Sequence, residues 1–78
     1  MMVFRCEPGQ RGWRVTRNGG VISVHGTRKR SVEVAKRAAL RMLATGSAVQ
    51  LVLVRKDGSV QSERTFDHDP PKPRQRRK

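Results

Sequence analysis

The chain has 78 residues, which allows one small domain with a marginal hydrophobic core and excludes a buried active-site cleft of ordinary size. Only 35% of the residues are hydrophobic and 4% aromatic, whereas 18 Lys and Arg against 6 Asp and Glu give a net charge of +12. This charge favours a polyanionic partner, and nucleic acid is the commonest polyanion in a cell. Without the five cations among the last seven residues the net charge is still 12 − 5 = +7, so the excess is not confined to the C-terminal end.

The first third of the chain predicts three short β-strands. Residues 2–6 (MVFRC) form a brief β-prone run, which the turn dipeptide Pro8-Gly9 ends. Residues 13–17 (WRVTR) and 21–25 (VISVH) flank the segment Asn18-Gly19-Gly20. Because Asn-Gly supplies the positive φ angles of a tight hairpin, we expect these two strands to pair antiparallel.

The periodicity changes after Gly26 to that of an α-helix over residues 27–43. Thr27 is the expected N-cap, and Gly46 can adopt the left-handed conformation that ends a helix. The apolar residues that form one stripe along this helix are Val32, Ala35, Ala39 and Leu43.

The last third predicts a hairpin and then an extended tail. Residues 48–54 (AVQLVLV) are rich in β-branched residues and indicate a central strand covered on both faces. Residues 56–59 (KDGS) are a hairpin signal, and the more polar residues 60–66 (VQSERTF) suit an edge strand. From Asp67 onward the prolines predict an extended or disordered segment.

These elements predict an α+β fold with the order ββ(β)-α-ββ, a small antiparallel sheet of four to five strands packed against one α-helix. The single domain is expected to span residues 1–69, and residues 70–78 are expected to form a flexible, disordered basic tail. The side chains expected to face the helix are those of Trp13, Val15, Ile22, Val24, Leu51 and Leu53.

Three segments of the chain resemble one known family. GWRVTRNGG, TRKRSVEVAKRAA and VLVRKDGSVQSERTFDHDPP are similar to the small bacterial and phage family catalogued as domain of unknown function 2188. The features that carry the resemblance, over residues 12–71, are Gly12-Trp13, Asp57-Gly58 and Asp69-Pro70 in this order and at similar spacing. The family has no established activity, so the resemblance implies a fold and no function. The chain departs from the family at Ser31, where alanine is usual, and in its extra residues 72–78.

No set of residues predicts catalysis or a metal site. Asp67, His68 and Asp69 are adjacent in an extended segment and point in alternating directions, whereas zinc needs about four ligands in a tetrahedron. Cys6 and His25 lack a ligand-like spacing and a Gly-rich oxyanion element. We therefore expect a protein that is not an enzyme and has no catalytic residues, no metal and no cofactor.

The single cysteine and the hydropathy of the chain bear on its compartment. One cysteine excludes an intramolecular disulfide and fits a reducing environment. The first ten residues lack the pattern of a signal peptide, and no segment approaches the roughly 18 apolar residues of a membrane span. A cytoplasmic protein without a membrane contact is the expectation.

The predicted helix carries a basic face opposite its apolar stripe, and such a face can track a phosphate backbone. The residues expected to bind nucleic acid are Arg30, Lys36, Arg37 and Arg41 on the helix, Arg14 on the sheet, and Arg74, Arg76, Arg77 and Lys78 in the tail. Exposed aromatic, Asn and Gln side chains are few, so weak, salt-sensitive and largely sequence-independent binding is expected, to DNA rather than RNA.

The sequence does not decide whether the helix or the sheet would bind nucleic acid. The hairpin followed by a helix also resembles, at the level of the fold alone, AP2-type and integrase-arm DNA-binding domains, whose sheet residues enter the major groove. That resemblance implies docking through the sheet, whereas the charge pattern of the helix favours docking through the helix.

A protein-interaction module is the alternative function. Val52 and Val54 are expected to point away from the helix, where an exposed apolar pair can mark a homodimer or a partner contact. In the competing interpretation the N-terminal strand or the tail covers both valines. Salt-sensitive binding to generic duplex DNA distinguishes the nucleic-acid function from a dimer that does not bind DNA.

Overall fold

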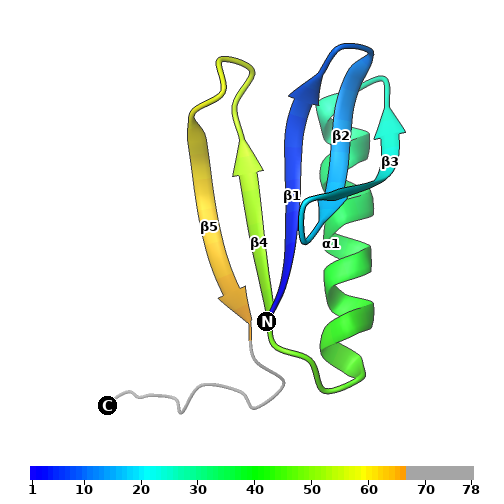
Figure 1. Cartoon of the computed structure of the whole chain (residues 1–78), viewed down its shortest axis with the longest axis vertical. Helices are drawn as coiled ribbons and strands as arrows, with labels where there is room; N and C mark the ends of the chain where they lie inside the picture. The colour runs from blue at the N-terminus through cyan, green and yellow to red at the C-terminus, as the bar shows by residue number, and fades with distance from the viewer. Residues whose placement is uncertain (67–78) are drawn as a thin grey trace.

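The computed structural model describes residues 1–66 as a five-stranded sheet with one helix across one of its faces (Figure 1). The strand order in the sheet is β3-β2-β1-β4-β5. The elements are β1 (Met2–Gly9), β2 (Gly12–Arg17), β3 (Gly20–His25), α1 (Arg28–Ala44), β4 (Val49–Val54) and β5 (Val60–Phe66). This confirms the predicted α+β class and the order of the elements. No helix in the described part of the chain is both long enough and apolar enough to cross a membrane.

The first strand lies at the centre of the sheet and is longer than predicted. It pairs antiparallel with β2 and parallel with β4, so the sheet is mixed and not wholly antiparallel. The parallel pair follows from the route of the chain, which leaves β3 and returns through α1 to β4. Pro8 can belong to β1 although proline has no backbone N–H to donate. The pairing of β1 with β4 ends at Cys6, so no residue of β4 needs a hydrogen bond from Pro8.

Local signals in the sequence produce the predicted turns and the predicted helix start. Asn18 and Gly19 have φ angles of 50° and 90°, which confirms the tight hairpin between β2 and β3. The backbone N–H of Arg30 donates to Oγ1 of Thr27 at 3.2 Å, so Thr27 is the N-cap of α1 as predicted. β5 is an edge strand, also as predicted.

The hydrophobic core lies between α1 and the middle of the sheet. Its buried members include Phe4 of β1, Val15 of β2 and Leu51 of β4, which pack against Ala35 and Ala39 of the helix. The two alanines are small, so the helix axis can approach the sheet closely over these strands.

The prediction that Ile22 and Val24 of β3 face the helix is wrong. Ile22 and Val24 are 44% and 51% exposed. Ser23 and His25 are the cross-strand partners of Val15 and Trp13, so they share the helix side of the sheet. A β-bulge shifts the register after Val15, and a shift of one residue exchanges the two faces of a strand.

A cysteine and a serine form a buried polar pair inside the core. Sγ of Cys6 and Oγ of Ser31 lie 2.7 Å apart, and both residues are buried. The Ser31 hydroxyl donates to the carbonyl oxygen of Arg28 at 2.7 Å, so its oxygen is left to accept the thiol proton of Cys6. Burial raises the pKa of the Cys6 thiol, which keeps it neutral at pH 7.

The Gly12→Ala substitution is expected to lower the free energy of unfolding by about 2–3 kcal/mol. Gly12 has a φ of 125°, and a Cβ atom there would overlap the carbonyl oxygen of His25 at the end of β3. The matched control is Gly26→Ala, since a Cβ at Gly26 meets open space. Urea unfolding followed by circular dichroism measures both variants, and equal losses of stability in the two would contradict this account.

The Cys6 thiol is expected to make stability depend on pH in the alkaline range. Because its pKa is higher in the folded chain than in the unfolded one, its contribution is complete below the unfolded pKa of about 8.5 and is lost as the pH rises above it. The slope of unfolding free energy against pH should be steeper in the wild type than in Cys6→Ala, by at most about 1.4 kcal/mol per pH unit. Identical slopes, or rapid alkylation of the native thiol at pH 7, would show that Cys6 is not protected in this way.

Candidate nucleic-acid interface

The described part of the chain carries most of the positive charge. It has 13 Lys and Arg and 4 Asp and Glu, a net charge of 13 − 4 = +9. Three of these acids already have partners. Two arginines bind Glu7, Arg30 lies 3.6 Å from Glu33, and hydrogen bonds from Ser59 hold the pKa of Asp57 below its usual value. These three acids are thus already engaged, and the cations that do not contact them stay uncompensated.

The exposed side chains of α1 carry +4 of this net charge of +9. The exposed charged residues on the helix are the cations Lys29, Arg30, Lys36, Arg37 and Arg41 and the acid Glu33, a net charge of 5 − 1 = +4. The helical repeat of 100° per residue places Arg30, Arg37 and Arg41 within an arc of about 40°. These three arginines, called the arginine row below, extend over about 16 Å of the helix axis.

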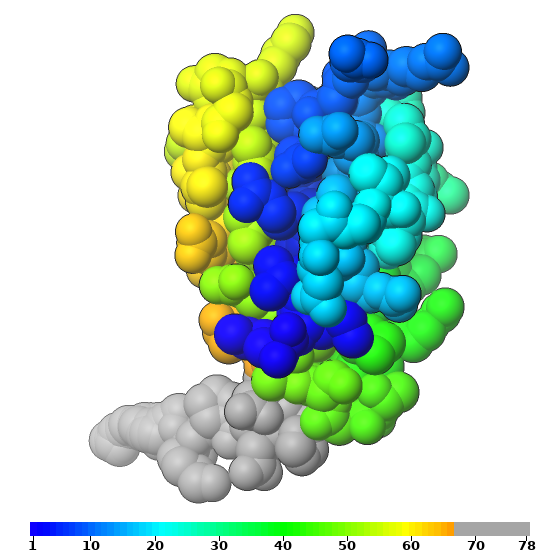
Figure 2. All heavy atoms as spheres, in the orientation of Figure 1, coloured from blue at the N-terminus to red at the C-terminus, as the bar shows by residue number. Residues whose placement is uncertain are grey.

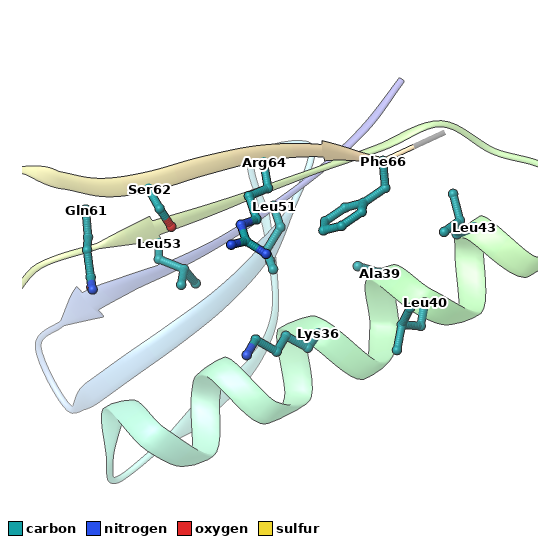
Figure 3. Close-up of a pocket in the computed structure, with 10 residues that line it drawn as sticks. All are labelled: Lys36, Ala39, Leu40, Leu43, Leu51, Leu53, Gln61, Ser62, Arg64 and Phe66. Carbon is teal, nitrogen blue, oxygen red and sulfur yellow. The ribbon is translucent and has the colours of Figure 1, made fainter. Parts of the chain in front are cut away.

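Lys36 lies on another side of the same helix. It is about 100° around the axis from Arg37, and its side chain extends along the space between α1 and β5 (Figure 3). The structure thus separates Lys36 from the three arginines with which it was grouped on the predicted basic face.

The sheet face that points away from α1 has no excess charge, although Arg14 was expected to bind nucleic acid there. Nη2 of Arg14 donates to Oε2 of Glu7 at 2.7 Å, and Nε of Arg5 donates to Oε1 of the same glutamate at 3.2 Å. Glu63 of β5 lies on this face too, so two arginines stand against two glutamates. Figure 2 shows this face, on which β1, β2 and β3 lie side by side. Arg14 is therefore compensated, and the sheet separates it from the arginine row.

The predicted exposure of Val52 and Val54 is wrong. Both valines alternate with the core residues Leu51 and Leu53 and so belong to the outer face, but their exposed fractions are only 5% and 2%. The reason is that β1 lies beside β4, which places Arg5 in register with Val52. The competing interpretation, in which the N-terminal strand covers the valines, agrees with this pairing. A homodimer through this face stays a prediction, without the exposed valine pair that suggested it.

The contacts that Arg28 makes were not predicted from the sequence. Its guanidinium lies 5.8 Å from the centre of the Trp13 ring, a cation–π distance, and its Nη2 donates to Oε1 of Gln61. As the first residue after the N-cap it points back toward the sheet, which ties the start of α1 to both β2 and β5. The Thr27 cap is the one signal from which this direction could have been inferred.

Cys6 and His25, which were not expected to form a site, each contact a serine. Cys6 is hydrogen-bonded to Ser31 beneath the helix, and Nε2 of His25 lies 2.9 Å from Oγ of Ser23. Within residues 1–66, no three His, Cys, Asp or Glu side chains come together as a metal site would require. The predicted residues Asp67, His68, Asp69, Arg74, Arg76, Arg77 and Lys78 lie outside the described residues, as does the predicted tail.

Comparison with known proteins gives one match. No curated protein and no solved structure matches the chain. One family matches residues 4–66, from within β1 to the end of β5, a range that both begins and ends earlier than the resemblance over residues 12–71. Since the match spans every helix and strand of the domain, the chain belongs to the family described as an uncharacterized protein conserved in bacteria (DUF2188).

Proposed function

We propose that this protein is a small, non-enzymatic, cytoplasmic protein of a bacterium or phage that associates with nucleic acid through its phosphate backbone. The observation that carries the proposal is the arginine row, three exposed arginines aligned along one side of α1, of which Arg30 lies beside Glu33 while Arg37 and Arg41 form no ion pair with another described residue. Each phosphate that such a cation neutralises releases condensed counterions, which drives binding without reading the sequence.

The charge distribution favours docking through the helix over docking through the sheet. The exposed side chains of α1 together have a net charge of 5 − 1 = +4, whereas on the outer sheet face the arginines Arg5 and Arg14 are matched by Glu7 and Glu63. A phosphate that approaches the outer sheet face would meet the carboxylate of Glu7 on the central strand β1. The helix in turn has no Asn, Gln or aromatic residue with which to read base edges or stack on bases. Weak binding to duplex DNA of any sequence is the function that this arrangement supports best.

Removing two members of the arginine row should lower the salt dependence of DNA binding. In the double variant Arg37→Ala/Arg41→Ala, the slope of log K against log salt is expected to fall in magnitude by about 1.8, because each phosphate contact contributes about 0.9. The matched control is Arg11→Ala/Arg17→Ala, which removes two exposed cations from β-hairpin ends and should leave the slope unchanged. Fluorescence anisotropy with a labelled generic duplex measures both variants.

A chain that ends at Pro71 separates the domain from the tail in the same assay. We expect it to bind duplex DNA more weakly than the full chain but still in a salt-dependent way, because α1 keeps its cations. Single-stranded and duplex RNA of matched length complete the comparison. If neither the full nor the shortened chain binds DNA or RNA at low ionic strength, the proposed function is wrong.

A further inference from the structure

An apolar groove runs between α1 and the edge strand β5 (Figure 3). The helix packs over β1, β2 and β4, which leaves the helix side of β5 largely open. Leu51 and Leu53 form the floor, Phe66 points from β5 toward the helix, and Leu40 and Leu43 of α1 form the opposite wall. This space, called the α1/β5 groove below, has a volume of about 460 Å³.

The helix wall of the groove has the spacing of a helix-packing surface. Lys36, Leu40 and Leu43 lie at positions i, i+4 and i+7, so they form one ridge along the side of α1. Leu40 is 63% exposed, more than any other large apolar residue of α1. Helix ridges of this kind pack into the grooves of a neighbouring helix.

The β5 edge is the part of this sheet face that α1 leaves uncovered, because α1 packs over β1, β2 and β4 and also touches β3. Strands lie about 4.8 Å apart in a sheet and a helix is about 10 Å across, so a second helix laid along β5 would rest partly on the strand and partly on the side of α1. A helix in this position would cover Leu51, Leu53 and Phe66 and would pack against the exposed side of Leu40.

The rim of the groove is positively charged. Lys36 on the helix and Arg64 on β5 are the charged residues that line it, and neither forms an ion pair with another described residue. Arg28 closes one end by its bond to Gln61. An occupant that complements the groove therefore has apolar residues on one face and carboxylates beside them.

We infer that the α1/β5 groove binds an acidic amphipathic helix of a partner protein. Apolar residues of that helix pack on Leu40, Leu43 and Phe66, and its Asp or Glu residues pair with Lys36 and Arg64. This contact goes beyond nucleic-acid association and uses a different side of α1 from the arginine row, so either can hold without the other.

Charge argues against two other occupants. A second copy of this chain that docked through the same groove would bring Lys36 and Arg64 of both copies together without an acid to separate them. The C-terminal residues 67–78 carry five Lys and Arg against two Asp, so they would meet the same cations with the same sign of charge. An acidic partner meets neither obstacle.

The test uses a fluorescein-labelled synthetic peptide of about 18 residues, five helical turns, with leucines at i, i+3, i+4 and i+7 and glutamates on the flanks. Binding to the full chain is measured by fluorescence anisotropy. Leu40→Ala is expected to weaken binding by about tenfold, because binding buries most of this leucine. Arg64→Glu is expected to weaken it by at least about tenfold, because it places like charges together.

Two matched control variants should bind the peptide as the wild type does. Val24→Ala removes an apolar side chain on β3 that is similarly exposed, and Arg37→Glu makes the same charge change on the other side of α1. All four substituted residues are partly or fully exposed, and circular dichroism confirms that each variant is folded. A control peptide of the same composition, with its leucines scattered around the helix, should bind at least about tenfold more weakly than the patterned one.

Several outcomes would overturn the inference. These are failure of the patterned peptide to bind the wild type, equal binding of the scattered peptide, or no effect of Leu40→Ala and Arg64→Glu. A dimer in light scattering that Leu40→Glu dissociates would assign the groove to a second copy of the chain.

Discussion

The central position of β1 determines most of the remaining architecture. With β2 antiparallel on one side and β4 parallel on the other, this strand joins the N-terminal hairpin to the C-terminal hairpin. The parallel pair requires a crossover, and α1 provides it by running from the β3 edge back to β4. The helix therefore lies over the middle of the sheet, and β5, added at the far edge beside β4, is left largely uncovered by it. Both the buried core and the open α1/β5 groove follow from the neighbours of one strand.

The same strand explains why charge gathers on the helix side. Arg5 and Glu7 of β1 point to the outer face, where Glu7 holds Arg5 and Arg14 in a compact network. That network compensates the outer face and shields the valines of β4 beside it. The helix has a single acid among its exposed cations, so its exposed side chains carry +4 of the domain's net charge of +9, whereas the charges of the outer sheet face cancel. Within α1, the arginine row and the groove ridge fall on different sides because of the helical repeat.

Local signals in the sequence predicted the elements well, whereas contacts between distant segments could not be read from it. The Asn-Gly turn, the Thr27 cap and the edge character of residues 60–66 depend on a few neighbouring residues, and each has its expected place. The parallel pairing of β1 with β4 joins residues that are far apart in the chain, so it cannot be predicted from a local pattern. The β-bulge after Val15 could not be predicted from the sequence either, and it is enough to exchange the faces of Ile22 and Val24. The helix cations were predicted from spacing, but the compensation of Arg14 by Glu7 depends on strand pairing.

The pairing of β1 with β4 also has a consequence for the order in which the protein can acquire its structure. The register joins Met2 to Val49 and Phe4 to Leu51, so during synthesis of this domain its first strand lacks one of its two neighbours until the fourth has been made. The hairpin of β2 and β3 and the helix can form from local contacts in the meantime, but Phe4 and Cys6 keep one flank open to solvent. The nascent domain thus exposes the edge of its own central strand until β4 has been made. Closure of the core is a late event, in which the two ends of the domain meet.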